Sequence, residues 1–370
     1  MIDKNILKSE ERAILTLRSI YRNYGYLPFK MSKFEEYDLY VGNKDFLVSD
    51  RVITFNDTDG RLLALKPDVT LSIIKHTSDE PGVKQKVCYN ENVYRISGTT
   101  GQFKEIMQMG LEAIGDIDVT DIYEVVYLAL SSLASLSSDF VLDVSHMGIL
   151  SAFLAEASDS ELFAKEVIEL ISNKNAHEIP EVAKKYGVCC EAAAKLSALA
   201  GVYGDMQSVI KKLEPLCDSV SSSRALSEMK VLSYLLSKSE YSDRVRFDFS
   251  VVHNMSYYDG IVFSGFLSGI CEAVLSGGEY GKLLSRLGRK SRAVGFAIYL
   301  DLLEELCYTE TDYDVDTVLI YDESVAMATV IDRRAELVGA GKSVTAQKCV
   351  PKKLRYRQII DMRNEGGSEV

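Results

Sequence analysis

Residues 87–115, VCYNENVYRISGTTGQFKEIMQMGLEAIG, predict two β-strands joined by a turn at 98–101. Alternate residues of the second strand belong to opposite faces of the sheet. The apolar face, which we expect on the core side, carries Phe103, Met107, Met109, Leu111 and Ala113. The other face carries Gln108, Gly110 and Glu112. A polar pair that flanks a glycine is an arrangement that a sheet can use to hold a small polar ligand, since the glycine leaves room between the two side chains. An ordinary half-solvated face is the alternative.

The same stretch carries a family motif. VYR followed by QMGLE resembles motif 2 of class II aminoacyl-tRNA synthetases, in the form found in histidyl-tRNA synthetases. In that family an arginine ends the first strand and a Gln-x-Gly-x-Glu segment binds the amino acid. The resemblance implies that Arg95, Gln108 and Glu112 line an amino-acid pocket. The turn ISGTTGQFK lacks the Arg- and Glu-rich stretch that holds ATP and the acceptor end of tRNA in the synthetases, which argues against aminoacylation.

Composition limits the classes of function. A chain of 370 residues exceeds one typical core and predicts one large domain with one or two smaller units. The net charge of -12 argues against a large nucleic-acid surface. The 7 cysteines are scattered without CxxC spacing, so we expect free thiols in a reducing cytoplasm, with neither a disulfide framework nor a zinc site. With no apolar signal core and no run of about 18 apolar residues, we expect a chain that is neither secreted nor membrane-spanning.

The N-terminal segments predict a helix over residues 8–24, ended by Gly25, and a hairpin in which RVITF and RLLAL flank NDTDG. Between them, GYLPFKMSKFEEYDLYV resembles class II motif 1, which builds the dimer interface in that family. Lys33 stands where the family has a proline. The resemblance implies a homodimer.

The segment ALKPDVTLSIIKHT predicts a strand ended by Pro67 and a helix that starts near Leu71, capped by Asp68 or Thr70. It resembles the LRPEGT segment of histidyl-tRNA synthetases, which supplies an acidic residue for the amino group of the substrate and a threonine beside it. The resemblance therefore adds Asp68 and Thr70 to the pocket, and helix capping alone is the alternative.

The middle of the chain predicts helices. An amphipathic helix is expected over residues 118–135, followed by a strand and a helix in DFVLDVSHMGIL, where we interpret His146 as a satisfied core or surface histidine. From about 151–240 the composition indicates a helical insertion. Cys189 and Cys190 are adjacent there, a poor geometry for chelation, and are interpreted as packing residues.

The strand signal returns in RVRFDFSVVHNMSYYDGIVFSGFLSG, which resembles the histidine-specific signature of the synthetases, a strand-turn-strand unit close to LVRGLDYYTGTVFE. Tyr257 and Tyr258 match, and one of them would offer its hydroxyl to an imidazole ring, while sheet packing is the alternative for the other. His253 stands at the place of the catalytic arginine, which contacts phosphate and carboxylate in the synthetases. An imidazole is a poor substitute for a permanent, bidentate cation.

Further on, GGEYGKLLSRLG resembles GGRYDGL of the synthetases, and AVGFAIYLDLLEEL resembles motif 3, a strand followed by a helix. Tyr299 fills the glycine position that admits adenine in that family, and Leu302 replaces the arginine that stacks on it. With the motif 2 turn and the signature arginine also changed, three ATP-handling devices are missing. We expect that this chain does not activate amino acids.

The tail, residues 311–370, predicts a β-α-β-α order that ends in a basic helix, KKLRYRQIIDMRN. It resembles the first half of the anticodon-binding domain of the same synthetases. A phosphoribosyl-diphosphate loop after VLIYDES is a competing interpretation, but no Gly-Thr-rich turn follows the acids. The fold expected overall is α+β: a class II synthetase-like antiparallel sheet flanked by helices over 1–310, with the helical insertion and this truncated α/β unit.

Retained amino-acid contacts beside lost nucleotide contacts resemble the regulatory subunits of ATP phosphoribosyltransferase, which are paralogues of histidyl-tRNA synthetase. The resemblance implies a cytoplasmic, non-catalytic chain without cofactor or metal that activates the short-form catalytic subunit in the first step of histidine biosynthesis and carries histidine feedback. A homodimer within a hetero-oligomer is also implied. A divergent histidyl-tRNA synthetase and a stand-alone histidine sensor are the alternatives.

The resemblance also implies roles for the site residues. Arg95 would hold the carboxylate of histidine, and Asp68 and Thr70 its amino group. Glu112 and Gln108 would hold the imidazole or the amino group. The implied histidine site comprises Asp68, Thr70, Arg95, Gln108, Glu112, Tyr257 and Tyr258.

Overall fold

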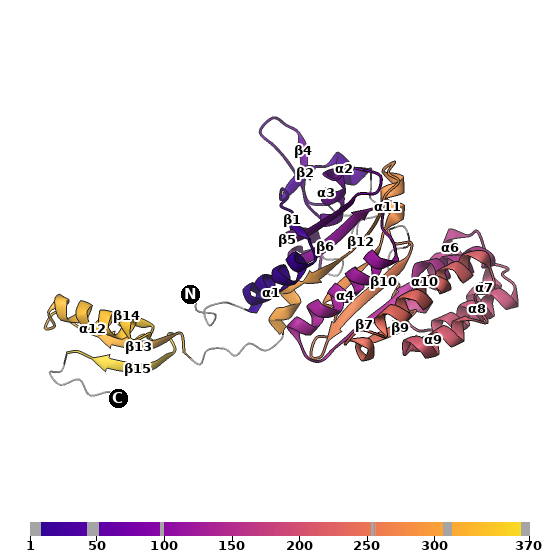
Figure 1. Ribbon diagram of the computed structural model, residues 1–370. Helices are drawn as coiled ribbons and strands as arrows, with labels where there is room; N and C mark the ends of the chain where they lie inside the picture. Colours follow the sequence, from indigo (N-terminus) through magenta and orange to yellow (C-terminus); the bar gives the residue numbers. More distant parts are fainter. Residues whose placement is uncertain are drawn as a thin grey trace. The chain divides into compact units, whose positions relative to one another are not determined.

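The computed structural model describes residues 9–42, 52–96, 100–252, 255, 257–305 and 313–363. The chain divides into two compact units, Met1–Leu306 and Cys307–Val370 (Figure 1).

The described residues of the large unit form a nine-stranded sheet with the order β1-β5-β6-β12-β11-β10-β7-β9-β8. Neighbouring strands are antiparallel except for the pairs β1–β5 and β7–β9. Helices flank the sheet, which confirms the expected α+β fold (Figure 1). In sheet order the strands are β1 (Leu27–Pro28), β5 (Lys84–Ile96), β6 (Phe103–Gly115), β12 (Arg292–Tyr299), β11 (Leu275–Glu279), β10 (Ile261–Leu267), β7 (Phe140–His146), β9 (Val245–Asp248) and β8 (Tyr203–Gly204).

The stretch at 87–115 forms the long hairpin β5–β6, which is paired from Lys84↔Gly115 to Ile96↔Phe103. Met109, Leu111 and Ala113 are buried in the main core as predicted. Phe103 is 72% exposed, so its assignment to the core is wrong. It is the first residue of β6, at the end where the hairpin leaves the packed part of the sheet.

Two helices pack on the core face of the sheet: α1 (Ser9–Asn23) and α4 (Val119–Leu136). Asp118 caps α4 in a capping box, and an apolar stripe of that helix is buried at the positions expected from its periodicity. Among the described helices, α4 is the one that is long and apolar enough to cross a membrane, but half of it is buried inside the unit. It is the central core helix.

A second layer lies beside the other face. The predicted hairpin is present as β3 (Thr54–Asn56) and β4 (Leu62–Leu65), and β2 (Phe34–Glu36) adds to β4 to give a small antiparallel sheet. Two short helices, α2 (Asp38–Val41) and α3 (Val69–Lys75), accompany it.

The range predicted as a helical insertion holds helices α6 to α10, which follow α5. Their bounds are α5 (Met147–Ala157), α6 (Glu161–Ser172), α7 (Ile179–Lys185), α8 (Cys190–Ala200), α9 (Met206–Leu213) and α10 (Val220–Leu236). His146 is buried, accepts from Gly148 N and pairs with Glu228 at 3.1 Å, which confirms a satisfied histidine. Cys189 and Cys190 are both exposed at the start of α8, so their interpretation as packing residues is wrong.

One other local prediction needs correction. The strands of the signature unit, β9 and β10, do not pair with each other, because β7 lies between them in the sheet. After β12 the chain forms a 3-10 helix, Leu300–Glu305, at the place where motif 3 predicts a helix after the strand. Between β11 and β12 lies the short helix α11 (Gly281–Arg286).

The second unit is a parallel sheet of order β14-β13-β15 with one described helix. Its elements are β13 (Val315–Ile320), α12 (Met327–Gly339), β14 (Val344–Gln347) and β15 (Tyr356–Asp361). The predicted final helix is therefore wrong. The segment YRQIID has a period of two, which places Gln358 against Thr317 of β13 (Nε2 to Oγ1, 3.0 Å) and buries Ile360. Resemblance to an anticodon-binding domain stays a prediction.

Candidate functional site

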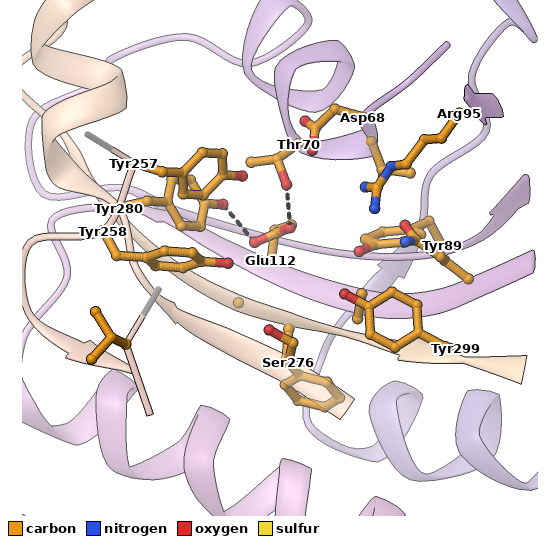
Figure 2. Close-up of a pocket in the computed structure, with 16 residues that line it drawn as sticks. Asp68, Thr70, Tyr89, Arg95, Glu112, Tyr257, Tyr258, Ser276, Tyr280 and Tyr299 are labelled. Carbon is orange, nitrogen blue, oxygen red and sulfur yellow. Dashed lines mark hydrogen bonds between the residues drawn. The ribbon is translucent and has the colours of Figure 1, made fainter. Parts of the chain in front are cut away.

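A cavity of about 430 Å³ lies on the polar face of β6, below the start of α3. This volume is in the range of small-molecule sites. All the predicted site residues line it: Asp68, Thr70, Arg95, Gln108, Glu112, Tyr257 and Tyr258 (Figure 2). Residues that are distant in sequence therefore meet in one pocket. His253, which was expected at the place of the catalytic arginine, lies outside the described residues.

The register between β6 and β12 builds the floor of the pocket. Glu112 pairs with Gly295, and Gln108 pairs with Tyr299. A Cβ on Gly295 would lie 1.8 Å from Glu112 Oε2, so a side chain there would displace the carboxyl group. The carboxyl group of Glu112 thus occupies space that is free only because Gly295 has no side chain.

The space left by the missing side chain of Gly110 is not available to a ligand, contrary to the prediction. A Cβ at this position would lie 2.2 Å from Phe296 O and 2.5 Å from the hydroxyl of Tyr89. The space above this glycine is filled by the protein itself. The expectation that Gly110 leaves room for a ligand is therefore wrong, and its absence of a side chain admits Tyr89.

Glu112 is the centre of the pocket. Thr70 Oγ1 donates to its Oε1 at 3.0 Å, and the hydroxyl of Tyr280 donates to its Oε2 at 2.5 Å (Figure 2). The side chain is buried, and burial raises the pKa of this carboxyl group to about 8 although both hydrogen bonds oppose the shift. A ligand that brings a positive charge or an N–H donor would satisfy it in its ionised form.

The start of α3 supplies the roof. Asp68 is the N-cap and accepts from Leu71 N at 2.9 Å, so the capping alternative holds for this residue even though it also lines the pocket. Burial raises the pKa of Asp68, and Arg95 acts in the opposite direction. Thr70 lies inside the helix and bonds to Glu112, so it is not the cap.

Tyrosines close both ends. Tyr257 packs against Tyr258 and Tyr280 at one end, with ring centroids 4.6 and 5.5 Å apart. Tyr89 and Tyr299 lie beside Arg95 at the other end (Figure 2). Burial raises the pKa of Tyr257, Tyr258, Tyr280 and Tyr89 well above the ordinary value, which keeps these phenols protonated and able to donate.

Sequence reasoning missed the contributions of Tyr89, Tyr280, Ser276 and Gly295. Tyr280 and Gly295 stand in segments that matched the family, but only the three-dimensional pairing of β6 with β12 and the contact with Glu112 reveal what they do. Leu302, at the expected adenine-stacking position, is half-buried and packs against the main core. Arg95 is the cation among the described residues that line the cavity.

No group of three or more His, Cys, Asp or Glu side chains that could hold a metal ion occurs in the part of the chain that the structure describes. The chemistry of this pocket is that of hydrogen bonds, one guanidinium and two carboxyl groups.

The pocket lies in the part of the chain that is similar to known proteins. The histidyl-tRNA synthetase family model matches residues 4–303. An ATP phosphoribosyltransferase regulatory subunit of Caldanaerobacter subterraneus is 30% identical over 290 residues, which are 77% of this chain and 75% of the relative. A protein of the same name from Oceanobacillus iheyensis is 27% identical over 78% of this chain and 72% of its own length.

Solved structures agree with this. The crystal structure of an ATP phosphoribosyltransferase regulatory subunit/histidyl-tRNA synthetase from Bacillus halodurans has a TM-score of 0.75 at 25% identity, over 98% of this chain and 96% of that one. A chain of the ATP phosphoribosyl transferase (HisG:HisZ) complex from Thermotoga maritima has a TM-score of 0.61 at 20% identity, over 79% and 97%, which shows a shared fold.

The raised pKa of Glu112 predicts a pH dependence of stability. Between the ordinary pKa of 4.5 and about 8, the folded chain holds a proton that the unfolded chain has released, so the free energy of unfolding falls as pH rises. The slope from this group is at most about 1.4 kcal/mol per pH unit. Glu112→Gln is expected to remove this contribution in urea unfolding measured from pH 5.5 to 7.5. The exposed Glu272→Gln is the control, and an equal slope in both variants would contradict the assignment.

Proposed function

The chain belongs to the histidyl-tRNA synthetase family and, within it, to the ATP phosphoribosyltransferase regulatory subunits, and from this premise we propose that it regulates an ATP phosphoribosyltransferase without catalysis of its own. It activates the short-form catalytic subunit in the first step of histidine biosynthesis and carries feedback inhibition by histidine. The observation that carries the proposal is a preformed cavity lined by all the residues expected to hold the amino acid, with Tyr299 also in its wall.

The partner is inferred from the relatives. Curated relatives carry the name of a regulatory subunit, and the Thermotoga maritima structure is a complex of two kinds of chain. Both observations support a catalytic subunit as the partner of this chain.

Histidine fits the distribution of charge in the pocket. Its carboxylate would bind Arg95, and its amino group and imidazole would bind Asp68 and Glu112, which line the same cavity. Gln108 and the hydroxyls of Tyr257 or Tyr258 supply further hydrogen bonds to the ring or the amino group. Binding of a cationic group favours ionised Glu112, so affinity should rise with pH up to about 8.

Inhibition requires more than binding. A ligand shifts an equilibrium only by its difference in affinity between two states. We therefore infer that histidine binds one quaternary state of the complex more tightly than the other. In this proposal the pocket provides the affinity for histidine, and the complex of subunits provides the two quaternary states that differ in it.

We also propose a homodimer through the small sheet. Phe34 and Phe55 are 48% and 38% exposed, and their rings meet edge to face at 5.8 Å. They share one face with Leu63 and Leu65, their cross-strand partners. Phe34 belongs to the segment that resembles motif 1, so a second copy of the chain is the expected occupant of this apolar face.

A divergent histidyl-tRNA synthetase is the rival function. Tyr299 and Leu302 occupy the positions that serve adenine in the synthetases, which disfavours ATP binding in this chain. A stand-alone histidine sensor would bind the amino acid but would have no transferase to regulate.

Activation is the first test. Mixing the full chain with a short-form catalytic subunit is expected to raise the rate of phosphoribosyl-ATP formation at least tenfold, and histidine should reverse the increase. If no complex forms and no activation is measured, the regulatory proposal is contradicted. ATP-pyrophosphate exchange with histidine then decides between a synthetase, which catalyses it, and a sensor, which does not.

Arg95→Ala is expected to weaken histidine binding by roughly 10- to 100-fold in calorimetry, since a charge-assisted hydrogen bond to the carboxylate is lost. Arg61→Ala, on the exposed hairpin, is the matched control and should leave affinity unchanged. Unchanged affinity in Arg95→Ala would remove this residue from the site.

The double variant Phe34→Glu/Phe55→Glu is expected to convert the free chain from dimer to monomer in light scattering, because it places charge on the apolar face. Phe103→Glu, on another exposed phenylalanine, should remain dimeric. A double variant that is still a dimer would refute this interface.

A further inference from the structure

We propose that Tyr89 and Tyr299, together with Arg95, recognise the free carboxylate of the bound amino acid. The pocket then accepts amino acids with an unmodified carboxylate and rejects those in which this group is reduced, esterified, amidated or joined to a nucleotide. The inference rests on the proposed function, since it assigns a specificity to the same pocket.

Arg95 is oriented for this task. Its Nε donates to Pro67 O at 3.1 Å, which fixes the plane of the guanidinium group. Figure 2 shows the guanidinium group directed into the pocket toward Tyr89, with Tyr299 beyond it. A planar guanidinium with free N–H groups is the side chain best suited to bind a carboxylate through two hydrogen bonds.

Both tyrosines are held by strands. Tyr299 ends β12, pairs with Gln108 and donates its backbone N–H to Val274 O at 2.9 Å. Tyr89 lies in β5, 4% exposed, with its hydroxyl above Gly110. Figure 2 shows both hydroxyl groups pointing toward the interior of the pocket. Burial raises the pKa of Tyr89, so its phenol is a donor at neutral pH.

The carboxyl group of Glu112 fixes the direction of the ligand. Glu112 lies at the centre of the pocket, hydrogen-bonded to Thr70 and Tyr280, where it can accept from an amino group or a ring N–H of the ligand (Figure 2). A zwitterionic amino acid therefore enters with its carboxylate toward Arg95. There the ring of Tyr299 stands where any group attached to the carboxylate would extend.

The test combines changes in the ligand with changes in the protein. Calorimetric titration compares histidine with histidinol, which carries a hydroxymethyl group in place of the carboxylate. Tyr299→Phe is expected to weaken histidine binding by roughly 10-fold and to change histidinol binding by less than about 2-fold, since only histidine loses a charge-assisted hydrogen bond. Tyr89→Phe should behave in the same way. Tyr258→Phe, at the other end of the pocket, should weaken both ligands by the same factor.

A second variant tests the exclusion of larger ligands. The wild-type chain is expected not to bind a sulfamoyl analogue of histidyl-adenylate, whereas Tyr299→Gly should bind it.

Wild-type chain that binds this analogue as tightly as histidine would overturn the inference. So would a Tyr299→Phe variant that loses affinity for histidine and histidinol equally, and in both cases histidine binding and the proposed function would stand. A wild-type chain that neither binds histidine nor activates the transferase would overturn both proposals. Thermal unfolding of each variant verifies that it is folded.

Discussion

The pairing of β6 with β12 is the constraint on which the pocket depends, because it sets Glu112 opposite Gly295 and Gln108 opposite Tyr299. In a strand the side chains alternate between faces, so a slip of one residue would turn Glu112 into the apolar core and Leu111 into the cavity. The apolar side of β6 prevents such a slip, since Met109, Leu111 and Ala113 are buried against α4 and its neighbours. The core residues of this strand thereby fix the position of the polar ones.

The same sheet explains how the proposed pocket would keep an amino acid and exclude a nucleotide. One half of the pocket contains buried carboxyl groups with hydroxyl donors, as in the contacts of Glu112 with Thr70 and Tyr280. The other half is built from bulky side chains at the ends of strands, of which Tyr299 is the clearest. Changing one residue at the end of a strand alters the length of the cavity but leaves the register, and therefore the half that contains Glu112, unchanged.

Local sequence patterns predicted those elements whose structure depends mainly on their own residues. The alternation in β6, the periodicity of α4 and the Asp-Gly hairpin turn all predicted the observed elements. The prediction of a final helix failed because YRQIID is a short segment whose pairing with β13 outweighs its helical composition. Tyr89 and Gly295 were missed because their roles come from contacts across strands that a single sequence does not reveal.

The wall of the pocket is also the point at which a ligand can act on the rest of the large unit. Tyr257 and Tyr258 line the cavity, and two residues later Gly260 O accepts a hydrogen bond from Met147 N at 2.8 Å, the first residue of α5. His146 caps the same helix and pairs with Glu228 on α10. These contacts join the wall of the pocket to the start of α5 and, through His146 and Glu228, to α10. Under the proposed regulation, a ligand that displaced the tyrosines would act first on this connection.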